Sequence, residues 1–230
     1  NLEAIELADR LSHPFSQVYA LSLACQVLQH RGEVDEVLKM SETAIGIAQE
    51  QGFAVWIASP SIFKGWAKAR QGSAREGDHE VNAAMEAIVK AGMEMRRPYY
   101  LALAAECLTS ADQFTEAGSV LDEALAIVAA TDEHWSEAEL LRLRGEIESR
   151  DDVAAAEASF QAALELARRQ EAKSWEQRAA ISLARLWHRQ GRHDEARDIL
   201  RPVHDWFSEG FDTPDLIEVG ALLGEWEADR

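Results

Sequence analysis

The sequence has few residues that break helices and no apolar run long enough to cross a membrane. Its 230 residues include 5 prolines and 13 glycines. The longest obvious apolar run, residues 124–130, is far shorter than the roughly 20 residues that a transmembrane helix needs. The first residues have neither the basic end nor the apolar centre of a signal peptide. We therefore expect a helical, cytoplasmic chain without a membrane-spanning segment.

Basic residues are scarce as well. The chain has 23 lysines and arginines against 41 aspartates and glutamates, a formal net charge of −18. A surface of this sign repels the phosphates of nucleic acids and the head groups of anionic lipids. We therefore expect neither nucleic acid nor a membrane as a partner.

Motifs for catalysis or cofactor binding are missing. No glycine-rich phosphate loop and no zinc-binding histidine motif occurs, and the seven histidines are scattered. The two cysteines, Cys25 and Cys107, stand in apolar helical stretches and are expected to be buried and reduced. The acidic pair Asp151-Asp152 stands at a predicted helix start, where it complements the helix dipole without any catalytic role. The sequence thus predicts no enzyme activity, no metal site and no cofactor.

A repeat of about 40 residues organises the whole chain. Small residues recur at this spacing in three registers, with one deletion between Gly145 and Ala156. The registers are Ala4, Ala44, Ala84, Ala124, Ala163 and Val203; Val37, Gly77, Ala117, Ala156 and Ala196; and Cys25, Gly65, Ala105, Gly145, Ala184 and Gly224. A small residue on one helix lets a bulky side chain or the backbone of its neighbour approach closely. The pattern therefore predicts stacked helical hairpins.

The predicted fold is all-α: a right-handed superhelical solenoid of about 12 antiparallel helices, formed by five hairpins and a half-repeat at each end. Capping boxes are expected at Ser73, Ser136 and Ser174, and Thr213-Pro214 is expected to start the last helix. We expect a single domain over 1–230 and, because of the odd helix at each end, a fragment of a larger protein. The predicted helices are 1–11, 14–31, 33–51, 53–71, 74–92, 96–111, 113–130, 134–149, 152–171, 174–190, 192–209 and 213–228.

The small and large positions resemble those of the tetratricopeptide repeat. The best-matching ones are Leu183, Ala184, Trp187, Gly191, Ala196, Leu200 and Val203, followed by Ala156, Phe160 and Ala163. Units of about 40 residues imply helices longer than those of the usual 34-residue repeat. HEAT repeats, which have a similar length but a different pattern of small and large residues, are the alternative fold.

A narrower resemblance lies in the second half, in the segments 134–140, 163–170 and 172–176, in Ser182–Trp187, and in Trp206–Leu216. These segments resemble the C-terminal tetratricopeptide region of bacterial proteins that join a class III adenylate cyclase domain to an AAA/STAND-type ATPase. The resemblance implies a regulatory region and carries no catalytic residues with it. Its implied partner is a protein or peptide segment, including the upstream ATPase domain itself.

The candidate site is the inner face formed by the first helix of each hairpin. Aromatic residues are frequent early on this face and arginines late, which is suited to binding an acidic segment or one with an aromatic anchor. The alternative is that the aromatic rings pack between repeats and the arginines pair with nearby glutamates. The predicted groove residues are Tyr19, Gln26, Trp66, Arg70, Tyr99, Glu106, Arg142, Arg185, His188 and Arg189.

The expected function is that of a non-catalytic interaction and sensor module in a bacterial signalling protein. Two alternatives remain open. One is a small-effector sensor of a LuxR-type STAND transcription regulator, which would need a closed and mostly apolar pocket. The other is a self-association scaffold, a homodimer formed through the end helices 1–11 and 213–228. The six other tryptophans, from Trp56 to Trp226, are expected to pack within and between repeats.

Overall fold

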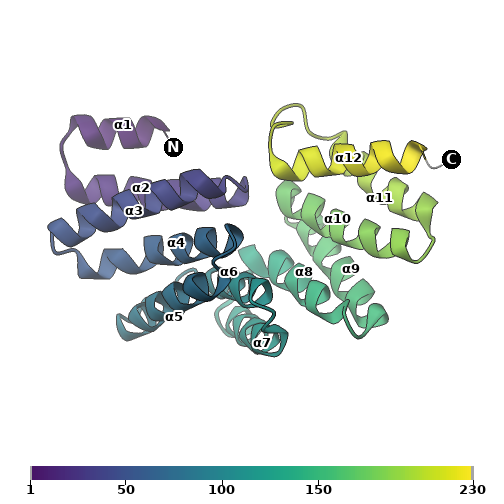
Figure 1. Ribbon diagram of the computed structural model, residues 1–230, viewed down its shortest axis with the longest axis horizontal. Coiled ribbons are helices and arrows are strands. Elements are labelled where there is room, and N and C mark those ends of the chain that lie inside the picture. Colours follow the sequence, from purple (N-terminus) through teal and green to yellow (C-terminus); the bar gives the residue numbers. More distant parts are fainter. Residues whose placement is uncertain (1, 229–230) are drawn as a thin grey trace. The chain divides into compact units, whose positions relative to one another are not determined.

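The computed structural model describes residues 2–228 and is built from helices (Figure 1). Two short 3₁₀ turns, Ala54–Ile57 and His134–Ser136, precede α4 and α8. In the described range there are twelve helices, the number that the repeat predicts. They are α1 Leu2–Arg10, α2 Pro14–His30, α3 Val34–Glu50, α4 Ala58–Arg70, α5 Ala74–Lys90, α6 Arg97–Ser110, α7 Phe114–Thr131, α8 Glu137–Glu148, α9 Val153–Arg169, α10 Lys173–Arg189, α11 His193–His204 and α12 Pro214–Ala228.

The chain forms two compact units, one up to Val120 and the other from Leu121 onwards. In the first unit the hairpins α2–α3 and α4–α5 pack closely, and α3 also contacts α4. In the second unit α8–α9 and α10–α11 are the hairpins, and α9 contacts α10. Each unit thus contains the repeated pairing of neighbouring antiparallel helices that the 40-residue period predicts.

Glycine makes the closest helix contacts possible, as the registers of small residues predict. A Cβ atom on Gly77 would lie 2.3 Å from the carbonyl oxygen of Gly65, so α4 and α5 cross with their backbones in contact. In the second unit, a Cβ atom on Gly145 would lie 2.5 Å from the ring of Phe160. The last member of this register, Gly224, is different: it is exposed, and an added Cβ would meet nothing within 4 Å.

Helix breaks lie where the predicted ranges 14–31, 53–71, 96–111 and 174–190 end, but several finer start and end predictions are wrong. Gly32, Gly72, Asp112 and Gly191 have positive φ angles at the ends of first helices, and Pro214 begins α12. The expected capping boxes are absent. Ser73 and Ser136 make no side-chain cap bond, and Ser174 lies inside α10, which begins at Lys173. Helix α11 ends at His204, five residues before the predicted 209, because residues 205–213 turn back before α12.

The core of each unit is rich in alanine and aliphatic residues, with the buried rings of Phe63 and Tyr99 in the first unit and of Phe160 in the second. Cys25 and Cys107 are both buried and free, as expected. Among the tryptophans, Trp226 is buried, but Trp206 is 58% exposed on the loop after α11, so the packing prediction is wrong for Trp206. No helix in the described range 2–228 is both long and apolar enough to span a membrane.

Candidate inner-face binding site

Each predicted groove residue lies on the first helix of a hairpin. In the first unit, α2 carries Tyr19 and Gln26, α4 carries Trp66 and Arg70, and α6 carries Tyr99 and Glu106. In the second unit, α8 carries Arg142, and α10 carries Arg185, His188 and Arg189. The predicted set therefore falls into two faces, one in each unit.

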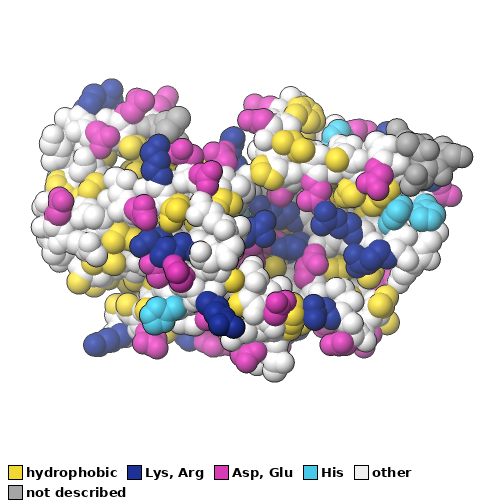
Figure 2. Space-filling model, in the orientation of Figure 1, with side chains coloured by type: hydrophobic (Ala, Val, Ile, Leu, Met, Phe, Trp, Pro, Cys, Tyr) yellow, Lys and Arg dark blue, Asp and Glu magenta, His cyan; other side chains and the backbone are white. Residues whose placement is uncertain are grey.

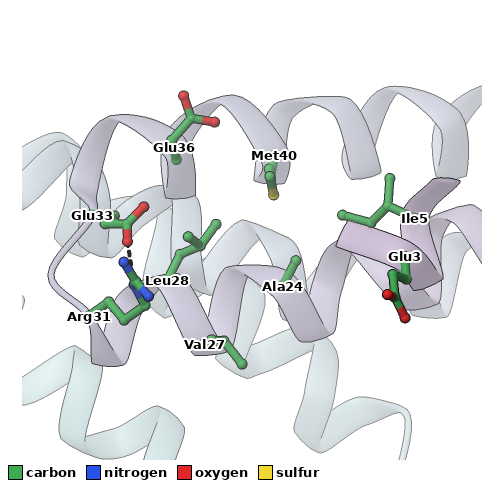
Figure 3. A pocket seen from close by; sticks show the side chains of 9 residues that line it. All are labelled: Glu3, Ile5, Ala24, Val27, Leu28, Arg31, Glu33, Glu36 and Met40. Carbon is green, nitrogen blue, oxygen red and sulfur yellow. Dashed lines mark hydrogen bonds and ion pairs between the residues drawn. The ribbon is translucent and has the colours of Figure 1, made fainter. Parts of the chain in front are cut away.

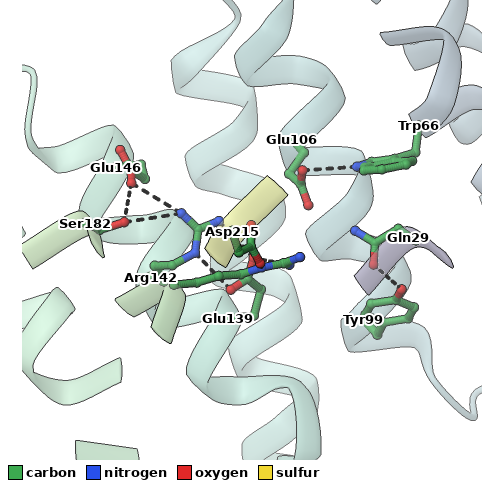
Figure 4. A network of polar contacts seen from close by, with 10 residues as sticks. Gln29, Trp66, Tyr99, Glu106, Glu139, Arg142, Glu146, Ser182 and Asp215 are labelled. Atoms are coloured by element: carbon green, nitrogen blue, oxygen red, sulfur yellow. Dashed lines mark hydrogen bonds and ion pairs between the residues drawn. The ribbon is translucent and has the colours of Figure 1, made fainter. Parts of the chain in front are cut away.

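The first helices of the first unit are joined by hydrogen bonds in which at most one of the two partners is charged (Figure 4). The Tyr99 hydroxyl donates to Gln29 Oε1 at 2.7 Å, and Trp66 Nε1 donates to Glu106 Oε2 at 3.0 Å. Arg96 Nη1 donates to Gln26 Oε1 at 3.2 Å. Sequence reasoning missed Gln29, although it lies three residues after Gln26 and is therefore nearly in line with it along α2.

Two of the three predicted aromatic residues of this face are buried in the protein and not exposed to a ligand. Trp66 and Tyr99 are 3% and 2% exposed, so their ring faces are not available to a ligand in this structure. Tyr19 is exposed and contacts Trp56 with the ring centroids 5.8 Å apart. Arg70 is exposed, and no ion pair involving it is found among the described residues. The first unit therefore matches the packed alternative for Trp66 and Tyr99.

A network of charged groups connects α8 and α10 in the second unit (Figure 4). Arg142 holds the buried Glu139 with two bonds, Nε to Oε2 at 2.9 Å and Nη2 to Oε1 at 2.8 Å. Its Nη1 donates to Glu146 Oε1 at 3.2 Å, and the Ser182 hydroxyl donates to the same oxygen at 2.6 Å. The expected pairing of arginines with nearby glutamates is thus found at Arg142.

Arg178 closes this network against α12. Its Nε donates to Asp215 Oδ2 at 2.7 Å, and its Nη1 lies 3.7 Å from Glu139 Oε1. Burial tends to lower the pKa of Arg178, but the charges of Glu139 and Asp215 outweigh burial and hold that pKa above its usual range. Arg178 precedes Arg185 by seven residues, or two helical turns, and this spacing is the sequence signal that places both on one face of α10.

The later turns of α10 are more open. The Arg185 side chain is 49% exposed, and its Nη2 lies 2.7 Å from Glu218 Oε1 of α12. Arg189 is exposed and makes no ion pair with the described residues. His188 stacks on Trp226, with the ring centroids 4.3 Å apart and the planes inclined by 10°. Lys and Arg side chains are visible over α8 and α10 in the space-filling view (Figure 2).

The side chains of this face are mainly charged and carry no catalytic arrangement among the described residues. Within residues 2–228 no group of three or more histidine, cysteine or acidic side chains could hold a metal ion. Burial raises the pKa of the Cys25 thiol to about 12 and raises that of Cys107 as well, so neither is a thiolate nucleophile at neutral pH. What α10 offers to a ligand is a pair of exposed guanidinium groups one turn apart.

A cavity lies elsewhere, between α1, α2 and α3 (Figure 3). Its volume is about 800 Å³, and Ala24, Val27, Leu28 and Met40 are among its apolar lining residues. Arg31 pairs with Glu33 at one end. The cavity is an open groove, unlike the closed apolar pocket that a small-effector sensor would need.

Comparisons with known proteins define the fold. No protein-family model matches the sequence, and neither does any curated protein. Among solved structures, a Rap protein complexed with Competence and Sporulation Factor is similar over 99% of this chain and 59% of its own, with a TM-score of 0.70 and 16% identity. BtubC (BKLC) from P. vanneervenii is similar over 87% of this chain and 85% of its own, with a TM-score of 0.61 and 17% identity.

A STAND protein with a tetratricopeptide repeat sensor, from Pyrococcus horikoshii, is similar over 90% of this chain but only 32% of its own. Its TM-score is 0.64 and its identity 15%. This chain therefore spans about a third of the STAND protein and somewhat more than half of the Rap protein. Identities this low show the fold alone, which is an all-α array of tetratricopeptide-like helical hairpins.

Proposed function

We propose that this chain is a non-catalytic sensor module that binds an acidic protein or peptide segment on the inner face of its second unit. The observation that carries the proposal is the pair of exposed arginines, Arg185 and Arg189, on one side of α10. Two guanidinium groups one helical turn apart suit two carboxylates of an extended or helical segment, because guanidinium and carboxylate form bidentate hydrogen bonds.

The rest of the face supports this assignment by holding in place the helix that carries those two arginines. Arg142 and Arg178 are already held by Glu139, Glu146 and Asp215. The pairs of Arg178 with Glu139 and Asp215 connect α10 to α8 and α12. Because Arg142 is engaged within α8, no guanidinium deeper in the face competes for the ligand. A preorganised face loses less conformational entropy on binding than a mobile one.

Similar proteins support a sensing role. The similar Rap structure is a complex with Competence and Sporulation Factor, and the similar STAND protein carries its tetratricopeptide repeats as a sensor. We infer that this chain reports ligand binding to a signalling ATPase, in the arrangement of bacterial proteins that also carry an adenylate cyclase domain. Binding would shift the parent protein's equilibrium by the difference in affinity between its two states.

The test uses an array of short acidic, neutral and basic peptides probed with the purified chain. The expected result is that acidic peptides are retained selectively, and that R185E/R189E loses them. R169E/R201E is the matched control, because it makes the same change in net charge on the second helices α9 and α11. Equal loss of binding in both double variants, or no preference for acidic peptides, would contradict the proposal.

A second candidate function, self-association, rests on the open groove between α1 and α3. Val27 lines this groove and is 44% exposed, and Leu7 and Leu11, on α1 and in the turn after it, are 48% and 65% exposed. Exposed apolar surface of this kind can form a contact between chains. Light scattering over a range of concentrations measures this directly. A mass that stays at one chain throughout would exclude the homodimer.

A further inference from the structure

The proposed binding face of α10 becomes more exposed to solvent toward the C-terminal end of the helix. Arg178, Ser182, Arg185 and Arg189 follow one another at four, three and four residues and so lie on one helical face. The Arg178 side chain is 15% exposed and Arg185 is 49% exposed. Only the open half, beginning at Arg185, can exchange its partner for a ligand without dismantling the buried network.

Two ion pairs of similar length tie α12 to this face, and they differ in burial. Arg178 meets Asp215 at 2.7 Å, deep in the face. Arg185 meets Glu218 at 2.7 Å, but here the two side chains are 49% and 34% exposed. An exposed pair contributes little free energy because water and salt screen it, whereas a buried pair resists separation. The Arg185–Glu218 pair is therefore the exchangeable one.

The surroundings of Glu218 disfavour the ionised form of its carboxyl group. Burial raises the pKa of Glu218, and the like charges of Asp215 and Glu146 raise it further, although Arg185 and Arg142 lower it. Arg142 is engaged with Glu139 and Glu146. Despite its close contact, Glu218 Oε1 has no well-aligned hydrogen bond. The carboxylate of Glu218 is thus only partly compensated where it stands.

We propose that Glu218 is a built-in competitor, which occupies on Arg185 the place of a ligand carboxylate and leaves it when the acidic segment binds. This inference rests on the proposed function and names its regulation. The exchange replaces one charge-assisted contact by another. The net free energy of binding is therefore the difference between the contact of the ligand with Arg185 and that of Glu218 with Arg185. The competitor sets the affinity threshold of the site.

The exchange also connects the ligand to α12. Asp215 and Glu218 lie in the first turns of that helix, and the stacked ring of Trp226 lies near its other end. When Glu218 is displaced, Arg178–Asp215 is the ion pair described here that still holds the start of α12 to α10. Ligand binding therefore removes one of the contacts that hold the start of α12, next to residues 205–213. A change in the position of α12 is a route by which the site can signal along the chain.

The experiment titrates tetraglutamate into the chain and into its E218Q variant, and follows the Nε–H signals of Arg185 and Arg189 by NMR. E218Q is expected to bind about threefold to tenfold more tightly, since the internal pair and its repulsion of the ligand are both removed. Affinity of the unaltered chain should rise as the pH is lowered toward the range in which Glu218 is protonated, and this rise should vanish in E218Q. E225Q, an exposed glutamate on the same helix, should behave like the unaltered chain.

The outcomes separate this inference from the proposed function. If tetraglutamate shifts the Arg185 and Arg189 signals with the same affinity in both proteins, the site binds acidic segments but Glu218 is not a competitor, and the inference is overturned alone. If neither protein shows shifts at these two arginines, the acidic ligand itself is wrong, and the proposed function fails together with the inference.

Discussion

In both units the first helices are connected through their side chains, but the chemistry of these contacts differs between the two units. In the first unit, α2, α4 and α6 are joined by Tyr99–Gln29 and Trp66–Glu106 around buried rings. In the second, α8, α10 and α12 are joined by arginines and carboxylates: Arg178 of α10 pairs with Glu139 of α8 and with Asp215 of α12. The first face is closed by side chains that fill space, and the second by charges that need partners.

This difference indicates which face can respond to a ligand. A packed ring can give way only by leaving a cavity, which costs several kcal/mol for a large aromatic side chain. A half-exposed ion pair can exchange one carboxylate for another at little cost. The first unit therefore has a face of packed rings, and the second unit has a face whose surface ion pairs can be replaced. Both units are built on the same 40-residue period.

The largest expected effect comes from removing the buried cation of the second face. R178M removes the ion-pair partner of Asp215 and one of the two arginines at the buried Glu139, and we expect a loss of about 3–5 kcal/mol in the free energy of unfolding. Chemical denaturation followed by tryptophan fluorescence measures it. The matched control is R169M, whose pair with Glu165 is exposed on both sides and should matter by less than about 0.5 kcal/mol. Equal values for the two variants would remove the distinction between deep and surface pairs.

A smaller effect is expected at the corresponding neutral bond of the first face. Y99F removes the hydroxyl that donates to Gln29 and keeps the buried ring, so the loss should be about 1–2 kcal/mol. Y19F is the control, since Tyr19 is 45% exposed. A loss for Y99F as large as that for R178M would mean that the two faces do not differ in the way described.

The smallest effect is a pH dependence of opposite sign at two places in the second unit. Burial tends to raise the pKa of Glu176, but hydrogen bonds from Lys173 and Arg168 outweigh it and leave that pKa below its ordinary value. Stability from Glu176 is therefore present above the ordinary glutamate pKa and lost as pH falls through the lowered one. Thermal melts of E176Q should lose part of the acid slope.

Glu218 should act in the opposite direction, because its pKa is raised. The stability associated with its protonated form is present below the ordinary glutamate pKa and lost as pH rises through the raised value. Thermal melts of E218Q should therefore be as high as those of the unaltered chain or higher at neutral pH. A marked drop in the E218Q melting temperature would show that Glu218 stabilises the fold and is no competitor for a ligand.

The sequence predicts the backbone of this molecule well and the use of its side chains less well. Period, helix number and the glycine contacts at Gly65 and Gly145 follow from spacing, because close helix approach permits few residue types. The capping boxes failed because a Ser-x-x-Glu pattern is weak evidence for a helix start when tertiary packing decides the boundary. The stop of α11 at His204 was missed because residues 205–209 were predicted to continue that helix.

The candidate site shows the same division. The pattern places Arg142, Arg185 and Arg189 on first helices, because position along a helix is fixed by the repeat. Which arginine remains open depends on contacts between helices, and those join residues far apart in the sequence, such as Arg178 and Asp215, which are 37 positions apart. Spacing within one helix does not specify such pairs.

The most direct test of an acidic ligand on α10 is a charge-swap cycle. An acidic peptide selected on the array, and the same peptide with its glutamates changed to lysines, are each titrated calorimetrically into the unaltered chain and into R185E/R189E. The account predicts that each charge reversal alone abolishes binding and that the two together restore most of it, a coupling of at least about 2 kcal/mol. Additive losses with no recovery would contradict a direct contact between these arginines and the ligand.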